Sequence, residues 1–285
     1  MIEGTMDRLI PQSVQQLEDV LAENVRHRRW TGLILTGSEI TLHHDLPRWA
    51  RRARASGFER VRVQTHGMRL ASRDYCTELV AAGVNEFFVS VAAADAQTHD
   101  AITGVRGSFA KTMQGLENLE AFRDVVSITN TVVTERSYRQ LPALVDGLES
   151  LDRLVQMEFW VYWPMTERDE KGLIASHLAV LPYLKDAIHR LRRRRLGLEV
   201  KNFPECLLGE DGGALDNDQP QLLIDPAFWP EFARNGFHHC LYRNQCASRQ
   251  CLGLNAAYVE RFGELAQDLH PIALSSQAMG MVGGA

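Results

Sequence analysis

Short apolar and β-branched runs alternate with amphipathic stretches along most of the chain, and this alternation constrains the fold more than any other feature. Successive runs start about 25–40 residues apart, which is the length of one strand–helix unit. The pattern predicts an α/β protein whose parallel sheet carries helices on its outside, either doubly wound or closed into a full or partial barrel. The strand-like runs are Gly32–Thr36, Val61–Thr65, Phe87–Val91, Val125–Thr134 and Leu154–Tyr162, with a shorter one at Leu198–Lys201.

The stretches between these runs have the apolar spacing of helices about three turns long. Pro182 falls inside the last of them, where a proline is expected to kink or restart a helix. Glu210–Pro220 is rich in Gly, Asp and Asn and predicts an exposed loop. The expected helices are Gln12–His27, Leu46–Ala55, Ser72–Ala82, Phe109–Phe122, Tyr138–Leu151 and Leu173–Leu191.

Composition narrows the class of protein. The 285 residues are 45% hydrophobic, which is enough for a sizeable core. A formal net charge of -5 gives no general case for nucleic-acid binding. No apolar run approaches the roughly 20 residues of a membrane helix, and Met1–Arg8 lacks the profile of a secretory signal. We therefore expect a cytoplasmic protein with no membrane or nucleic-acid partner.

The loop Thr36–Leu46 follows an apolar strand and contains one glycine and one acid near its start. In α/β enzymes, ligands bind at the carboxyl ends of the strands, where such loops lie. Gly37 lets the backbone approach a ligand closely, and the Glu39 carboxylate can accept a hydrogen bond from a cationic amine.

This loop and later segments resemble, in the same order, motifs of the radical S-adenosylmethionine (SAM) superfamily. The resemblance covers about residues 10–265 and implies a partial parallel (β/α)6-type barrel that lacks its first strand. The matching segments are Gly37-Ser-Glu-Ile40 (usually Gly-Gly-Glu-Pro), Gln64-Thr-His-Gly67, Val89-Ser-Val91, the loop Thr98–Gly104 followed by Gly107–Thr112, and Asn130–Thr134.

The resemblance implies a set of residues around SAM. Glu39 would hold its amino group, with Gly37 and Ser38 beside it, and Ser90 would meet its ribose or carboxylate. Asn130 sits in an apolar strand, where an unpaired amide costs about 1–3 kcal/mol, so it needs a partner. An inward-facing partner of Asn130 would be a cofactor or substrate, and for Ser90 a bond to the neighbouring backbone is the alternative. Tyr162 lies near the expected adenine, with core packing as the alternative.

One family element is missing from the sequence. The C-x-x-x-C-x-x-C motif that holds the SAM-binding [4Fe–4S] cluster has no counterpart, because the first cysteine is Cys76, within an expected helix. Two explanations remain open: an internal start within a longer reading frame, which we favour, or a relative that has lost the cluster. We therefore expect the 285-residue chain to lack radical activity.

Four cysteines fall late in the chain and offer the thiolates that a [4Fe–4S] cluster or a structural zinc needs. Their surroundings resemble the extension that carries an auxiliary cluster in peptide-modifying members of the family, which normally has more cysteines. Free buried thiols are the alternative. The neighbouring residues His43-His-Asp45 also suggest a metal, although a capping role fits adjacent loop residues better. The four cysteines are Cys206, Cys240, Cys246 and Cys251.

The expected organisation is a barrel over residues 1–196, an extension over 197–270 and a disordered tail over 271–285. The resemblance implies an enzyme that modifies a peptide or small metabolite through a 5′-deoxyadenosyl radical, with flavodoxin or ferredoxin as an electron donor. A non-catalytic binding or scaffold relative is the first alternative. An ordinary barrel lyase that uses Glu39 and His66 as acid and base is the second.

Overall fold

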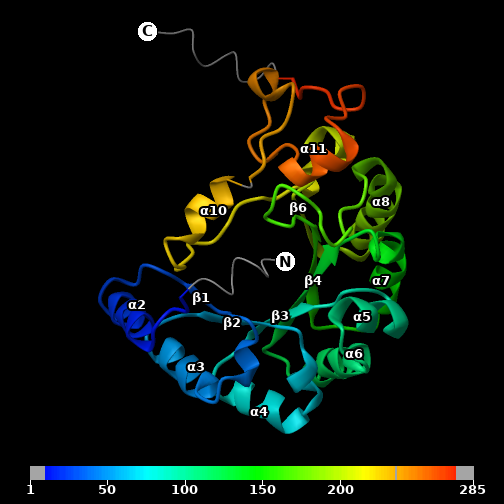
Figure 1. Ribbon diagram of the computed structural model, residues 1–285. Helices are drawn as coiled ribbons and strands as arrows, with labels where there is room; N and C mark the ends of the chain where they lie inside the picture. Colours follow the sequence, from blue (N-terminus) through cyan, green and yellow to red (C-terminus); the bar gives the residue numbers. More distant parts are fainter. Residues whose placement is uncertain (1–9, 235, 274–285) are drawn as a thin grey trace, which may run out of the picture.

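A single curved sheet of six parallel strands forms the centre of the protein (Figure 1). The computed structural model describes residues 10–234 and 236–273. The strands follow one another in chain order from one edge to the other, so each crossover joins neighbours. They are β1 (Gly32–Leu35), β2 (Arg60–Thr65), β3 (Glu86–Ser90), β4 (Val126–Val133), β5 (Leu154–Val161) and β6 (Gly197–Lys201). The expected parallel sheet and partial barrel are confirmed.

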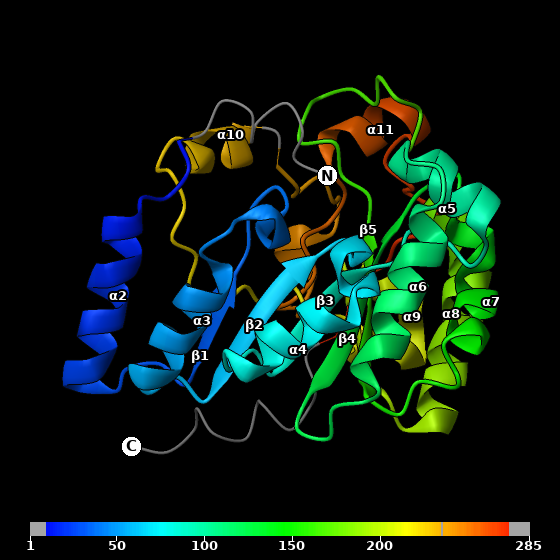
Figure 2. The same cartoon turned by 90° about the horizontal axis from the view of Figure 1, so that it is seen from below.

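Helices form an arc around the outside of the sheet, as Figure 1 shows, and Figure 2 gives the same arrangement from below. Those of the barrel are α2 (Val14–His27), α3 (Leu46–Ala55), α4 (Arg73–Ala81), α5 (Ala96–Thr103), α6 (Ser108–Leu119), α7 (Leu141–Gly147) and α8 (His177–Arg194). The core lies between this arc and the sheet, and alternate strand residues such as Val61, Val63, Phe87, Val89 and Phe159 fill it.

The opposite, inner face of the sheet is more polar. Ser90 pairs with Asn130 across β3 and β4, Asn130 pairs with Glu158 on β5, and Glu158 pairs with Glu199 on β6. Paired residues of a parallel ladder point to the same face. The register therefore sets two predicted site residues in one row with two carboxylates.

Two sequence-based expectations about helices are wrong. Thr98–Gly104, expected as a loop, lies mostly in α5, whose first turn is capped by the Asp95 carboxylate. Tyr138–Leu151 is a 3-10 turn followed by the short α7, not one helix. Pro182 lies inside α8, which runs on through it without restarting.

The C-terminal region carries α9 (Glu205–Leu208), α10 (Phe228–Arg234) and α11 (Ala256–Phe262). In Figure 1, α11 lies on the β6 side of the molecule, whereas α10 lies toward α2 and β1, where Trp30 donates a hydrogen bond to Gln221. The segment after α9, expected as an exposed loop, includes a 3-10 turn over Gly209–Ala214 with Asp211 buried. Leu215 then bridges to Val200 of β6. Part of the expected tail, residues 274–285, lies outside the described residues.

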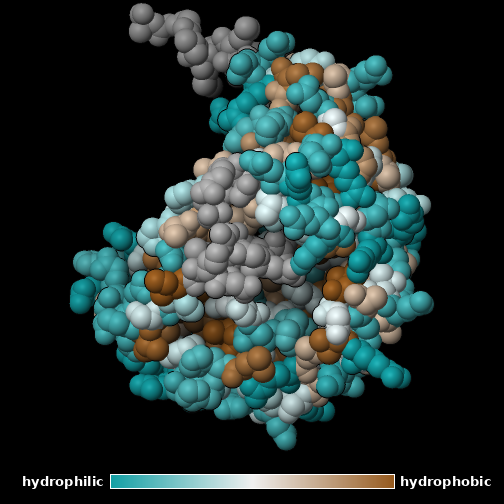
Figure 3. Space-filling model, viewed as in Figure 1, coloured by the Kyte–Doolittle hydropathy of each residue, from teal (hydrophilic) through white to brown (hydrophobic). Residues whose placement is uncertain are grey.

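Most of the face seen in Figure 3 is hydrophilic, with hydrophobic residues scattered over it. No helix among residues 10–234 and 236–273 is both long and apolar enough to span a bilayer.

Candidate functional site

Glu39 stands at the carboxyl end of β1, and the chain itself occupies both of its oxygens. Oε1 accepts hydrogen bonds from the backbone and hydroxyl of Thr41 and from the Thr65 hydroxyl at 2.7 Å. Oε2 accepts from the His66 backbone N–H at 2.9 Å and lies 3.1 Å from the His66 ring Nε2. The side chain is 8% exposed. The carboxylate therefore ties the β1 loop to the end of β2.

His66 reaches from this network to the next strand end. Its ring Nδ1 accepts the Met68 N–H at 3.2 Å, which leaves Nε2 to donate to Glu39. The following Gly67 has φ of 80°, and a Cβ there would meet Val89 at 2.8 Å. Only glycine fits this tight turn without strain, and the turn places His66 at the wall of a cavity.

That cavity, of about 200 Å³, opens at the carboxyl ends of β3 and β4 beneath α5 and α6. Ser90 and Asn130, both predicted from the sequence, line it together with His66. Its volume is below the roughly 300–1,000 Å³ of sites that take a whole drug-sized ligand. It suits one portion of a ligand. The remaining lining residues are Met68, Val91, Ala92, His99, Ile102, Thr103, Val105, Ser108, Thr112 and Val132.

Two buried side-chain nitrogens of this cavity have no partner among the residues that the structure describes: Nδ2 of Asn130 and Nε2 of His99. Asn130 is 4% exposed and His99 is 2% exposed. Buried polar groups are nearly always hydrogen-bonded, and each exception calls for an explanation. Here the unpaired atoms belong to residues around an empty space, which is the arrangement expected of a ligand site.

A polar network behind the cavity joins α5 to α6. Ser108 and the backbone of Phe109 donate to Asp100, and so does the Gly107 backbone. These bonds, first that from Phe109 and then that from Gly107, hold the pKa of the Asp100 carboxyl below its usual range. His99 Nδ1 lies 3.1 Å from the Ser108 hydroxyl. The sequence marked this segment only as a family match.

Glu158 is a site candidate that the sequence reasoning missed. It is 4% exposed on the inner face of β5, where it accepts hydrogen bonds from Trp160 at 2.7 Å and Gln156 at 2.9 Å. Burial, and next the Glu199 carboxylate, raise its pKa. The signal was present, because an acid inside an apolar strand needs partners just as Asn130 does.

The surroundings of the other predicted cofactor residues neither support nor oppose a contact with SAM. Gly37 and Ser38 are exposed in the loop after β1, and a Cβ on Gly37 would meet no atom within 4 Å. Nothing in the chain itself therefore requires glycine at that position. Tyr162 follows β5, is 9% exposed and belongs to the hydrophobic core, outside the cavity lining. Their contacts with SAM stay predictions.

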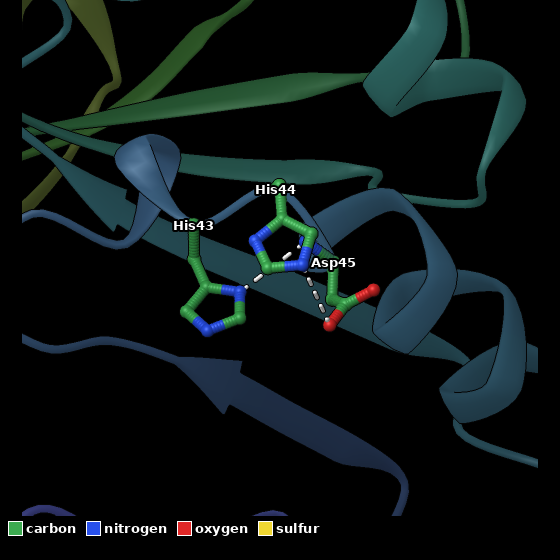
Figure 4. A group of neighbouring side chains, drawn as sticks. All are labelled: His43, His44 and Asp45. Carbon is green, nitrogen blue, oxygen red and sulfur yellow. Dashed lines mark hydrogen bonds and ion pairs between the residues drawn. The ribbon is translucent and has the colours of Figure 1, made fainter.

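His43, His44 and Asp45 gather in the loop before α3 (Figure 4). One ligand atom from each lies within 4.8 Å of the others. His43 Nδ1 already accepts the Asp45 N–H at 3.2 Å, and the His44 ring lies 3.3 Å from the Asp45 carboxylate. Asp45 precedes α3 without a side-chain cap bond, so the Asp45 side chain does not supply the capping role expected of this group.

The four late cysteines come together beside β6. Burial raises the pKa of the Cys206 thiol, and the three other cysteines, which lie within electrostatic range of it, raise this pKa further. Backbone N–H groups of Ile272 and Gly253 donate to the sulfurs of Cys246 and Cys251 at 3.3 and 3.4 Å. Cys76 lies apart within α4, where burial raises its pKa to about 11.

Comparison with known families agrees with this geometry. The family model of the radical SAM superfamily matches residues 4–146, which is half of the chain. The chain belongs to the radical SAM superfamily. The family uses SAM and a [4Fe–4S] cluster.

Curated relatives have different activities. The chain is 35% identical over 143 residues to an AdoMet-dependent heme synthase of Methanosarcina barkeri, covering 50% of this chain and 40% of that protein. It is 30% identical over 192 residues to an Fe-coproporphyrin III synthase of the same organism, covering 67% and 45%. A Methanopyrus kandleri protein named probable GTP 3′,8-cyclase is 32% identical over 120 residues, covering 42% and 38%. The chain therefore spans less than half the length of these relatives.

Among solved structures, native anSMEcpe with bound AdoMet and the Kp18Cys peptide is similar, with a TM-score of 0.54 and 14% identity. The match covers 66% of this chain and 55% of that one. The same protein with bound AdoMet alone gives a TM-score of 0.53, again at 14% identity, over 66% and 54% of the two chains. At this identity the similarity shows the fold alone.

The residues present fit one family cofactor better than the other. For SAM, the cavity offers the unpaired amide of Asn130 beside Ser90 at the strand ends. For the SAM-binding cluster, this sequence offers no thiolate ahead of Cys76, which is buried in α4 and contacts the Leu70 carbonyl at 3.0 Å. We therefore assign no residue of this chain to that cluster.

Proposed function

We propose that this chain binds SAM at the carboxyl ends of β1–β4 and is the SAM-binding part of a radical SAM enzyme that acts on a peptide or a small metabolite. The observation that carries the proposal is the cavity with the unpaired Asn130 amide, in the protein's own family fold. In the family, SAM bound at an iron–sulfur cluster is cleaved to a 5′-deoxyadenosyl radical. This chain's residues would bind and orient SAM and keep water away from it.

The two substrate classes both have support among relatives. Curated relatives are named for tetrapyrrole and nucleotide chemistry, which favours a small metabolite. The solved structure of similar fold holds a peptide. The inner face of the sheet, with buried Glu158 near Trp160, is polar enough to orient either one.

A non-catalytic SAM-binding relative is the second candidate, because this sequence lacks the family's three-cysteine motif. The two candidates differ in whether SAM is cleaved. Under anaerobic conditions with iron, sulfide and a reductant, the enzyme releases 5′-deoxyadenosine and methionine, whereas the binding protein releases neither. Because the 285-residue chain lacks that motif, the comparison uses the protein extended upstream of Met1, and release of neither product by an extended protein that binds SAM would favour the second candidate.

Equilibrium binding of SAM tests what both candidates share. We expect Asn130→Ala and Ser90→Ala each to weaken SAM binding by about two- to tenfold, the net worth of one hydrogen bond. Ser150→Ala and Asn244→Ala, at exposed positions, are matched controls that should bind as the unaltered chain does. If the unaltered chain does not bind SAM, or if the cavity variants bind it equally well, the proposed site is wrong.

We also propose that Cys206, Cys240, Cys246 and Cys251 bind an auxiliary [4Fe–4S] cluster. Two sulfurs on one zinc ion, at about 2.3 Å each, cannot lie more than about 4.6 Å apart. Within the described residues, no three cysteine sulfurs lie mutually within 4.8 Å. A cluster in which each thiolate binds its own iron accepts this wider spacing, and N–H···S bonds such as those to Cys246 and Cys251 tune such clusters.

Metal content tests the cluster separately from SAM binding. Anaerobically purified protein should hold about four irons and matching sulfide. Cys251→Ala should lose most of both, while Cys76→Ala, the control, should keep them because its sulfur is buried within α4. Zinc in place of iron, or unchanged iron in Cys251→Ala, would contradict the assignment.

A further inference from the structure

His99 forms part of the cavity wall. The proposed SAM contacts at Ser90 and Asn130 give this buried histidine no role. The residue lies in α5, 2% exposed, with its ring edge-on to Phe109 at 5.4 Å. Nε2 has no partner, while Nδ1 lies against Ser108. The role of the free nitrogen depends on which ring nitrogen carries the proton.

The hydrogen bonds behind the ring decide this. The backbone N–H groups of Gly107 and Phe109 donate to the Asp100 carboxylate, and the Ser108 hydroxyl donates to the same group at 2.9 Å. A hydroxyl has one proton. The Ser108 oxygen can therefore only accept at its 3.1 Å contact with His99 Nδ1. It follows that Nδ1 carries the proton and Nε2 is a bare acceptor.

The ring is also held neutral. Burial lowers the pKa of His99, and the Asp100 carboxylate, 3.8 Å from Nδ1, opposes this shift without cancelling it. Across the same cavity the Asn130 amide has an unused donor, Nδ2. The walls near these two atoms are otherwise largely apolar: Met68, Val91, Ile102, Val105 and Val132.

We propose that His99 is a recognition residue of this cavity, with Nε2 accepting and Asn130 Nδ2 donating, so that the cavity selects a neutral group such as a hydroxyl or an amide. A carboxylate or a sulfate brings no donor for Nε2 at neutral pH. An ammonium group brings no acceptor for Asn130. A group that both donates and accepts satisfies both buried atoms at once.

Two sources could supply such a group: the nucleoside portion of SAM or the amide of a peptide substrate. In this respect the inference rests on the proposed function, because it names what that site accepts. The state of the His99 ring does not depend on the ligand. It can therefore be measured on the unliganded protein.

The first test is the proton on the ring. Long-range proton–nitrogen NMR spectra of ¹⁵N-histidine-labelled protein, with His99 assigned by its loss in His99→Gln, should show a neutral ring protonated at Nδ1. A proton on Nε2, or an imidazolium at pH near 7, overturns the inference and leaves SAM binding untouched. If Nδ1 carries the proton but the unaltered chain does not bind SAM, only the proposed function is wrong.

The second test is ligand response in the same spectra. Adenosine stands for the nucleoside and N-acetylglycinamide for a peptide amide, and the one that shifts His99 Nε2 identifies the source. Inorganic sulfate, which carries no proton near pH 7, should leave it unchanged. A response to sulfate, or no response to either neutral probe at the highest concentrations the folded protein tolerates, overturns the proposal.

Variants complete the test. His99→Leu removes the acceptor and should weaken binding of the responding probe by about two- to tenfold. His99→Gln, which returns an amide oxygen near the place of Nε2, should restore part of that loss. His44→Leu, at a side chain 87% exposed, is the matched control. Equal binding by His99→Leu and the unaltered chain contradicts the proposal.

Discussion

The β1 loop and the cavity at β3 and β4 both lie at the carboxyl ends of the strands, yet they treat their polar groups in opposite ways. Glu39, in the loop, accepts from Thr41, Thr65 and His66 with both oxygens. Asn130 and His99, around the cavity, each keep a buried nitrogen without a partner. One region is complete without a ligand, and the other is not.

The two regions share a location at the strand ends but differ in whether their polar groups already have partners. A SAM amino group at Glu39 would have to replace or share bonds that the chain already makes, so its net gain there is small. A ligand in the cavity gains bonds that nothing else supplies. We infer that Glu39 chiefly holds the mouth of the barrel in shape, and that the cavity contributes more to ligand affinity.

The largest expected effect is on stability, at Glu39. Glu39→Ala leaves the buried Thr65 hydroxyl and the N–H groups of Thr41 and His66 without their acceptor. An unsatisfied buried donor costs about 1–3 kcal/mol, and water entering at the loop should satisfy some of these groups. We expect a loss of about 2–4 kcal/mol in the free energy of unfolding, measured by urea denaturation.

Two variants bracket this prediction. Glu39→Gln keeps one acceptor oxygen and should lose roughly half as much, while Glu59→Ala, at an exposed acid, should change stability little. If Glu39→Ala unfolds at the same urea concentration as the unaltered chain, the carboxylate does not hold the loop. The contrast between the two regions would then disappear.

The next effect has the opposite sign. Asn130→Leu replaces an amide that has an unpaired donor with an apolar side chain of similar size, so the desolvation cost disappears. We expect unfolding to cost the same or up to about 1 kcal/mol more, while SAM binding weakens. Denaturation and binding measured on one preparation check both halves. A large loss of stability would show that the amide has a partner in the folded protein.

The sequence predicted the strands well because their signal is local. Each expected run overlaps an observed strand, since apolar and β-branched residues mark them directly. The helix errors have local causes too. Pro142, at the second position of α7, has no N–H to bond back to Tyr138, and proline at this position favours a new helix start rather than the continuation of an earlier turn. In α5, polar residues with low helix propensity hid a helix that the Asp95 cap and the burial of His99 stabilise.

The sequence predicted where the site lies but not which of its polar groups already have partners within the chain. Ser90 was predicted from the family resemblance, and Asn130 also because its strand position carries a polar group where apolar ones are usual. The partners of Glu39 come from residues 26 and 27 positions later, and the register of β2 against β1 brings them there. No local pattern contains that information, nor the closeness of His99 to Asn130 in one cavity.

The smallest expected effect is on the pH dependence of stability, and it comes from His99 in the cavity wall. The pKa of His99 lies below its ordinary value, chiefly because burial disfavours the imidazolium. As pH falls through about 6.5, the unfolded chain takes up a proton that the folded chain refuses, so stability is lost on acidification. His99→Phe should therefore show a flatter decline in unfolding free energy between about pH 7 and 5. His177 and His238, whose pKa values burial also lowers, act alike in both proteins and cancel in the difference. If the unfolding free energies of the two proteins fall in parallel, the His99 ring takes up its proton as readily in the folded chain as in the unfolded one. The unpaired nitrogen would then be in contact with water and would not be a desolvated ligand-binding group.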